Sequence, residues 1–151
     1  NNVTDYGSNF MFVQHVLSMD TTFEGNELQW RAVEQPALHH VAYSLIIACE
    51  FLTGLLSGAG ACVMLSRRRA PISSFHAGIM LASWGLLLGL LLWFGGFMVV
   101  GAEWFLMWQS DSWNGQDAAF RFLVSIVTTL IFIHLPEPVH LQPGNPAMKD
   151  L

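Results

Sequence analysis

Charged residues are scarce in this chain. Asp, Glu, Lys and Arg make up 11% of its 151 residues, and hydrophobic residues make up 53%. A soluble domain carries about 25% charged residues, so too little charge is present to cover a water-facing surface. This shortage excludes an ordinary soluble domain. The net charge of −5, with Arg67, Arg68 and Arg69 as the only basic run, gives no indication of nucleic-acid binding.

Cysteines and catalytic motifs are scarce as well. Cys49 and Cys62 are the only cysteines, and both lie in one apolar run. They would be about 20 Å apart along a helix, which is too far for a disulfide, so we interpret both as packing residues. The sequence has no Ser-His-Asp set, phosphate loop or pair of catalytic carboxylates, and it predicts no enzymatic activity.

Three long apolar runs dominate the rest of the sequence. They cover about residues 41–65, 74–104 and 118–135, and each run is continuous rather than alternating. A helix needs about 20 apolar residues to cross a bilayer, and in lipid only helices and closed barrels satisfy their own backbone. We therefore predict an all-α integral membrane bundle with three transmembrane helices in this chain.

The arginine triplet predicts the orientation of this bundle. Positively charged loops stay in the cytoplasm, so the loop with Arg67–Arg69 is predicted to be cytoplasmic in a bacterial inner membrane. Residues 1–38 are then a periplasmic segment, residues 39–135 form the transmembrane bundle, and residues 136–151 are a cytoplasmic tail. The periplasmic segment should fold into a cap, because it has apolar residues to bury: Phe10, Phe12, Val13, Val16, Leu17 and Trp30. Since nothing within it could export it, we expect a further transmembrane helix before Asn1, making four, or a cleaved signal peptide.

Several blocks of the sequence resemble one family. They are DYGSNF (5–10), FVQHVLSMDT (12–21), PALHH (36–40), LWFGGF (92–97), GAEWFLMWQS (101–110) and WNGQ with FRF (113–122). Over most of residues 4–133 the chain is similar to a bacterial family of predicted small integral membrane proteins, domain of unknown function 2165. The resemblance implies a four-helix membrane protein whose first helix precedes the Asp5-Tyr6-Gly7 motif. It implies no activity, cofactor or catalytic residue.

Small residues in the first two runs predict where helices pack. Gly54 and Gly58 form a GxxxG pattern in the first run, and Gly85 and Gly89 form another in the second. Gly78, Ala82 and Gly96 lie largely on the same side as the second pair. Small residues let helix backbones approach closely in lipid, so we interpret both strips as packing seams of the bundle.

Glu50 is the only charged residue inside the first run. Helical spacing places it on one polar face with Thr53, Ser57, His39 and Tyr43. A carboxyl near mid-membrane is costly and commonly marks function. Three interpretations stay open: a neutral hydrogen-bonded clamp between helices, a site for protons, ions or a quinone, and a contact with a partner subunit.

Side chains that could bind a metal gather on the predicted outer side. They are His15, His39, His40 and Glu103, with Met19 and Asp20 nearby. Imidazole, carboxylate and thioether groups suit zinc, iron or copper, but no pair has a tight metal-binding spacing. The alternative is that these histidines hydrogen-bond the outer loops. A haem held by two histidines would need His76 with His134, or His15 with His39 or His40.

Asp117 and Arg121 are predicted to form a salt bridge at the outer end of the third helix. They lie four residues apart, a spacing that brings side chains together on a helix. Arg121 could instead reach Glu103 on the neighbouring helix. Either pairing would have a structural role.

Three classes of function remain open. The first is a non-catalytic accessory or scaffold subunit of a larger membrane complex, of respiratory or photosynthetic type. The second is a small transporter, channel or proton-coupled protein that uses Glu50, and the third is a metal, haem or quinone site at the outer histidines. The sequence requires no cofactor. The expected partners are the lipid bilayer with bound lipid, and other membrane subunits or further copies of the chain.

Overall fold

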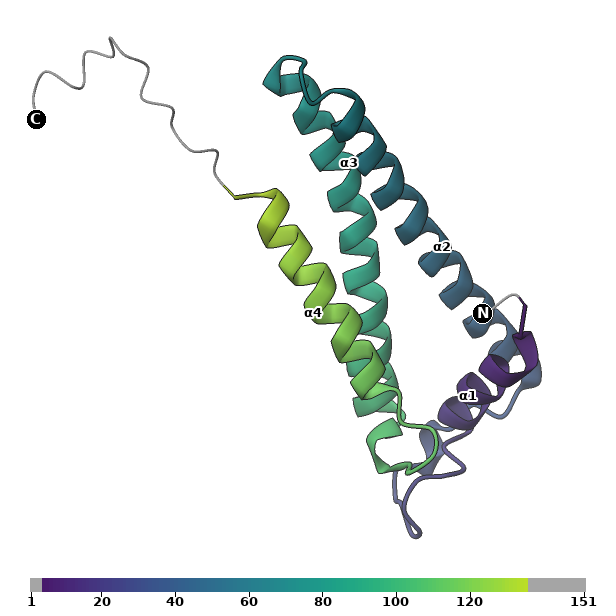
Figure 1. The fold of residues 1–151 in the computed structure, drawn as a ribbon. Helices are drawn as coiled ribbons and strands as arrows, with labels where there is room; N and C mark the ends of the chain where they lie inside the picture. Colours follow the sequence, from purple (N-terminus) through teal and green to yellow (C-terminus); the bar gives the residue numbers. More distant parts are fainter. Residues whose placement is uncertain (1–3, 136–151) are drawn as a thin grey trace, which may run out of the picture.

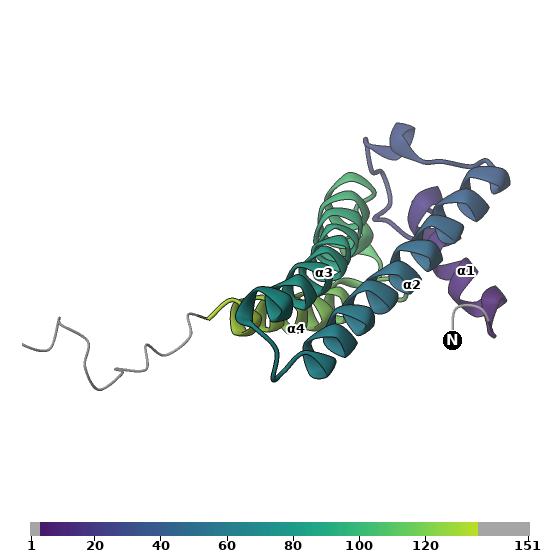
Figure 2. The same cartoon turned by 90° about the horizontal axis from the view of Figure 1, so that it is seen from above.

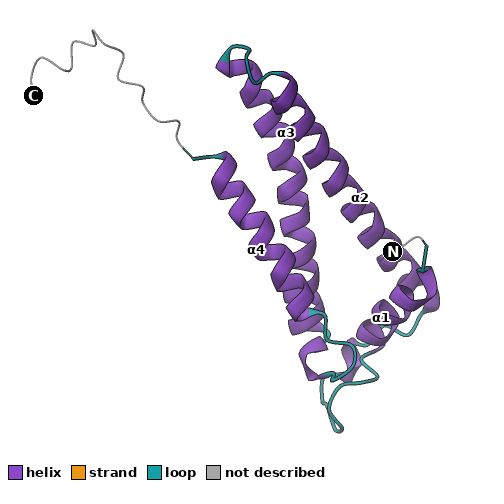
Figure 3. Ribbon diagram, in the orientation of Figure 1, coloured by secondary structure: helices purple, strands orange, loops and turns teal. Residues whose placement is uncertain are grey.

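The computed structural model describes residues 4–135, which form helices joined by loops and contain no strand (Figure 3). The predicted tail, residues 136–151, lies outside the described residues. In chain order the elements are helix α1 (Tyr6–Ser18), the 3-10 turn η1 (Gln29–Arg31), helix α2 (Pro36–Ser66), helix α3 (Ile72–Leu90), its continuation η2 (Leu91–Trp104), the 3-10 turn η3 (Met107–Gln109) and helix α4 (Gln116–Ile133).

Three helices are long and apolar enough to cross a membrane: Pro36–Ser66, Ile72–Trp104 and Gln116–Ile133. The predicted all-α membrane bundle is therefore confirmed. α2 starts at Pro36 rather than near residue 41, because proline is well suited to the first position of a helix. α4 is the shortest, and its 18 residues span roughly 27 Å at 1.5 Å per residue, close to the bilayer core of about 30 Å.

The outward surfaces of these helices are apolar. Phe51 on α2 is 68% exposed, Leu91 on η2 is 68% exposed and Phe132 on α4 is 73% exposed. Large exposed apolar surfaces mark contact with a membrane or with another protein. These faces are therefore suited to lipid or to neighbouring transmembrane helices.

The second membrane-spanning helix changes its type midway. It is α-helical to Leu90, and η2 continues it as a π-helix of 14 residues. At its end the Phe105 N–H donates to the Val100 carbonyl, five residues back, at 3.0 Å. The sequence predicted one regular helix over residues 74–104. Gly95 and Gly96 give this stretch unusual backbone freedom.

α2 and the second membrane-spanning helix form a V (Figure 1). The two helices are close together at the hairpin turn and diverge toward the other end, where α1 packs against α2. α4 packs along α3 and η2, so that the second span contacts both of its neighbours (Figure 2). α2 and η2 are therefore farthest apart at the end that carries α1 (Figure 1).

A seam of small residues holds the narrow end of the V together. A Cβ atom placed on Gly60 would lie 2.7 Å from the Gly78 carbonyl oxygen, and one on Gly85 would lie 2.6 Å from Ser57 Oγ. One on Gly89 would lie 2.9 Å from a methyl carbon of Thr53. We call this contact the glycine seam; it comprises Thr53, Ser57, Gly60 and Met64 of α2 with Gly78, Ala82, Gly85 and Gly89 of α3. Along this seam the backbones of α2 and α3 approach each other closely, as small residues allow in lipid.

Gly54 and Gly58 lie outside the glycine seam, contrary to the predicted packing. A Cβ atom at either position would have nothing within 4 Å among the residues that the structure describes. Each glycine comes one position after a seam residue, Thr53 or Ser57. With 3.6 residues per turn, one position rotates a residue by about 100° around the helix axis, so the two glycines face away from the seam. We call this pair the open glycine strip, because no other helix of the described chain covers it.

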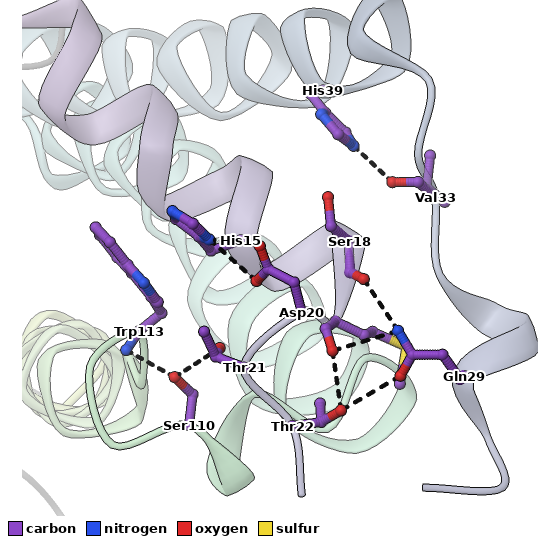
Figure 4. Close-up of polar contacts among 11 residues, drawn as sticks. His15, Ser18, Asp20, Thr21, Thr22, Gln29, Val33, His39, Ser110 and Trp113 are labelled. Carbon is purple, nitrogen blue, oxygen red and sulfur yellow. Dashed lines mark hydrogen bonds and ion pairs between the residues drawn. The ribbon is translucent and has the colours of Figure 1, made fainter. Parts of the chain in front are cut away.

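The segment before α2 and the loop after η2 fold together into a cap. Its core consists of Val16, Met19, Ala102, Phe105, Leu106 and Met107. Thr21 Oγ1 donates to Ser110 Oγ at 2.9 Å and thereby links the two segments (Figure 4). Residues far apart in the sequence thus build one small apolar core at the open end of the V.

The apolar residues predicted to be buried in the cap behave differently from one another. Val13 and Val16 are buried, and Phe10, Phe12 and Leu17 are half-buried. Trp30 is 71% exposed, so its predicted burial is wrong. Its ring instead meets Trp104 edge to face at 6.2 Å, because the turn η1 places it at the rim of the cap.

Candidate functional site

Two adjoining cavities fill the opening between α2 and η2. The first measures about 240 Å³ and is lined by α1, α2 and η2, with Phe105 and Met107 of the cap. The second measures about 200 Å³ and includes Asn9, Tyr43, Glu50 and Trp93. Both are lined by Phe12, Val13, Ile46 and Phe97. The two cavities adjoin at these shared side chains, and we call the pair the vestibule.

The polar groups of the vestibule come from two helices. Glu50 and Tyr43 are seven residues apart on α2, which is nearly two turns and places them on one face, and Asn9 comes from α1. Glu50 is half-buried, whereas Tyr43 is only 2% exposed and its ring meets Tyr6 edge to face at 4.7 Å. The remaining walls are apolar, so the vestibule combines a carboxyl group with an aromatic lining.

The polar face predicted around Glu50 divides into two parts. Glu50 faces the vestibule, whereas Thr53 and Ser57 pack against Gly89 and Gly85 in the glycine seam. The two hydroxyl oxygens are buried and have no hydrogen-bond partner among the described residues. Weak hydrogen bonds from Cα–H groups recur at such helix contacts. The seam is tight at these residues, and neither hydroxyl lines the vestibule.

The outer histidines make separate contacts (Figure 4). His15 Nδ1 lies 2.8 Å from the Asp20 carboxylate, and its ring stacks on Trp113 at 4.6 Å. His39 is buried, and its Nε2–H donates to the Val33 carbonyl at 2.6 Å. This bond holds the loop that leads into α2.

His40 and Glu103 complete the predicted metal-ligand set, and they lie apart from the others. His40 Nδ1 is 2.8 Å from the Tyr6 hydroxyl, and its ring stacks on Phe10 at 4.1 Å. Glu103 is exposed. Within residues 4–135 no three His, Cys, Asp or Glu side chains are placed to hold a metal ion. The predicted cluster is therefore not brought together, because each histidine contacts a different loop or ring.

Replacing His39 with leucine is expected to lower the free energy of unfolding by about 1–3 kcal/mol, because the Val33 carbonyl loses its buried partner. Thermal unfolding in detergent followed by circular dichroism measures the change. The control is His40→Leu, whose exposed bond to Tyr6 should cost less than about 1 kcal/mol. Equal losses in the two variants would contradict this structural role of His39.

His76 and His134 line one cavity of about 660 Å³ between α3 and the end of α4. His134 Nε2 lies 3.4 Å from Ser83 Oγ. Ser83 is seven residues after His76, roughly 10 Å further along the helix. The two imidazoles therefore do not face each other at one depth, as ligation of one haem iron requires.

The predicted salt bridge between Asp117 and Arg121 is not formed. In the described part of the chain, neither residue makes an ion pair with the other or with Glu103. Both side chains are exposed, and exposed pairs of this kind contribute little. Asp117 lies in the first turn of α4, where the helix dipole favours a negative charge.

Sequence reasoning missed the role of Arg31. Its guanidinium lies over the Trp104 ring at 4.6 Å and over the Trp30 ring at 5.5 Å, and it donates to the Trp104 carbonyl at 3.3 Å. It thereby fastens the cap to the end of η2. The only signal in the sequence is that Arg31 is the single Lys or Arg among the acidic residues of the first 38 positions.

Three apolar helices, a tight hairpin and a small cap define a small helical integral membrane protein. The chain belongs to the family of predicted small integral membrane proteins DUF2165, whose model matches residues 1–136. No curated protein and no solved structure is significantly similar to it. The family description names no activity.

Proposed function

We propose that this protein is a non-catalytic accessory or scaffold subunit of a larger membrane complex, of respiratory or photosynthetic type, which docks a transmembrane helix of a partner. The observation that supports the proposal is the open glycine strip of Gly54 and Gly58 on α2. In the described part of the chain, nothing lies within 4 Å of a Cβ atom at either glycine.

The contrast between the two small-residue surfaces supports a docking role. In the glycine seam every small residue contacts the opposite helix. The open glycine strip has the same chemistry, but no helix within residues 4–135 lies against it. Its neighbours Phe51 and Leu55 are 68% and 53% exposed. In lipid, small residues promote association because they allow two backbones to approach. A second helix would gain this contact at the strip.

We further propose that the protein lies in the bacterial inner membrane, with its hairpin turn in the cytoplasm and residues 1–38 in the periplasm. Arg67, Arg68 and Arg69 are all exposed at the hairpin turn, as expected for a loop retained in the cytoplasm. The cap lies at the opposite ends of the helices (Figure 1). This arrangement leaves the open glycine strip within the membrane span.

Replacing Gly58 with leucine tests the docking function, because among residues 4–135 nothing lies within 4 Å of a Cβ atom at this position. The variant should keep the thermal stability of the isolated protein but lose its stoichiometric co-purification with a larger assembly from native membranes. The matched control is Met80→Leu, at a 63% exposed position of α3, which should retain the assembly.

A photo-crosslinking side chain at position 58 provides the direct readout. Irradiated native membranes should yield one discrete adduct of higher mass, whereas the same side chain at position 80 should yield none. Three results contradict the proposal: no adduct at position 58, the same adduct at position 80, or retention of the assembly by the Gly58→Leu variant.

A further inference from the structure

We infer that the cavity between α3 and the end of α4 binds an acyl chain of an anionic phospholipid, whose phosphate group is bound by the arginines of the hairpin turn. We call this space of about 660 Å³, which His76 and His134 line with apolar residues, the hairpin cavity. The inference does not depend on the proposed docking function, because neither Gly54 nor Gly58 lines the hairpin cavity.

The walls of the hairpin cavity are apolar apart from the two imidazoles, and they come from three helices. Met64 belongs to α2, Phe75 and Ile79 to α3, and Phe132 and Ile133 to α4. α4 ends on the same side of the bundle as the hairpin turn (Figure 1). The cavity is half-open, so an acyl chain can enter it from the surrounding lipid while the helices stay packed.

The dimensions of the hairpin cavity suit part of a lipid chain. Its lining on α3 extends from Ile72 to Ile79, which is roughly 10 Å along the helix. Its volume lies within the range of about 300–1,000 Å³ that is typical of small-molecule sites. Apolar walls alone do not distinguish one lipid from another, because all lipid tails are similarly apolar. Selection must therefore come from the polar end of the site.

Positive charge lies directly beside the hairpin cavity. Arg67–Arg69 stand in the chain between Met64 and Ile72, and both of these flanking residues line the cavity. All three arginines are exposed, and Arg67 Nη1 lies 3.5 Å from the Ser74 carbonyl oxygen, at the start of α3. Arginine is well suited to phosphate because its planar guanidinium can donate two parallel hydrogen bonds.

No carboxylate of the described chain lies at this end to neutralise the arginines. Residues 51–102, which include the whole hairpin, contain no Asp or Glu, and Asp117, in the first turn of α4, is the only acidic residue of that helix. The exposed His76 imidazole adds a possible hydrogen-bond donor at the cavity. Basic sites between transmembrane helices bind anionic lipid head groups, and the charge of this site has the same sign.

The combination favours a lipid phosphate over free phosphate. Exposed charges are screened by salt and water, so the arginines alone hold a soluble anion weakly. A phospholipid carries its phosphate and its acyl chain in one molecule. When the chain occupies the cavity, the phosphate stays near the turn at a high effective concentration.

Retention of tritiated phosphatidylglycerol by the immobilised full chain in mixed micelles tests this inference. Binding should be saturable. Unlabelled phosphatidylcholine with the same acyl chains should compete at least about tenfold less well than unlabelled phosphatidylglycerol. Inorganic phosphate in large excess should displace none of the labelled lipid, which distinguishes a lipid site from a site for a free anion.

Replacing Arg68 and Arg69 together with glutamine should weaken binding of phosphatidylglycerol about tenfold or more, while competition by phosphatidylcholine stays unchanged. Arg67 is kept because of its contact with Ser74. The matched control is Arg121→Gln, which removes an exposed arginine of α4 that does not line the hairpin cavity. This control should bind as the wild-type protein does.

A second variant keeps the test decisive if the arginine variant does not fold. Ile79→Trp adds a large ring to the wall of the cavity and leaves the arginines in place, and it should also weaken binding about tenfold. Met80→Trp adds the same ring one position later, where the side chain is 63% exposed and outside the lining, and should retain binding.

Size-exclusion profiles and circular dichroism establish that each variant is folded. Four results would overturn the inference: no saturable binding, equal competition by the two lipids, displacement of the lipid by inorganic phosphate, or unchanged binding in a folded arginine variant or a folded Ile79→Trp protein.

Discussion

Replacing Gly60 with alanine is expected to lower the free energy of unfolding by about 3 kcal/mol, at the upper end of typical overpacking costs. The new Cβ atom would lie 2.7 Å from both the Ala82 Cβ atom and the Gly78 carbonyl oxygen, and it would also meet the backbone nitrogen of Ala82. Since backbone atoms of α3 cannot rotate away as a side chain can, the two helices must separate. Reversible unfolding of the purified protein in mixed micelles measures the loss.

Gly54→Ala is the matched control on the same helix. A Cβ atom at Gly54 has nothing within 4 Å, so the change in unfolding free energy should stay within about 1 kcal/mol, the difference in helix propensity between glycine and alanine. A Gly60→Ala protein as stable as wild type, or equal losses in the two variants, would show that the glycine seam does not hold the hairpin.

Phe105→Ala should destabilise the cap by about 3–5 kcal/mol, as is usual when a large core aromatic is removed. Phe105 is 8% exposed and packs in the cap core with Met19 and Met107. The cap is predicted to lie in water, where burial of apolar area supplies the main driving force. Limited proteolysis of residues 20–35 should become much faster, while the membrane-spanning helices keep their helical circular dichroism.

Phe23→Ala is the control for the cap. Phe23 is 59% exposed and meets Trp108 edge to face at 5.7 Å, a pair worth about 0.5–1.5 kcal/mol beyond its buried area. Its removal should leave proteolysis of the cap nearly unchanged. Equal protection in the Phe105→Ala and wild-type proteins would contradict a cap held together by this core.

The membrane-spanning helices could be predicted from the sequence because each corresponds to one continuous run of apolar residues. A run of about 20 apolar residues has few alternatives in lipid. Their ends were less certain, because the start of α2 at Pro36 depends on helix-start chemistry, which lies outside the apolar run. The helix expected before Asn1 stays a prediction.

Contacts between helices could not be predicted in the same way. Gly54 and Gly58 match a packing pattern as well as Gly85 and Gly89 do, yet only the second pair packs on the facing helix. The sequence shows that a strip of the helix consists of small residues, but it does not show which helix packs against that strip. The π-helical stretch Leu91–Trp104 carries no distinctive local signal, since its glycines are compatible with several backbone conformations.

The vestibule was only partly predictable. Glu50 was identified because a charge inside an apolar run is rare. Its aromatic neighbours were not, because Phe12 comes from the cap and Trp93 from the second membrane span. The predicted metal cluster of outer histidines was not found. Residues expected at one depth in the membrane can point in different directions, and His15, His39 and His40 each contact a different partner.

The central claim is that the chain crosses the membrane three times, with the arginine hairpin on one side and the cap on the other. Labelling with a membrane-impermeant maleimide tests it, using Glu24→Cys and Arg68→Cys separately in a protein whose Cys49 and Cys62 are replaced by alanine. In spheroplasts, position 24 should be labelled and position 68 should react only after the membrane is permeabilised. Labelling of both positions, or of position 68 alone, in sealed spheroplasts would contradict the account.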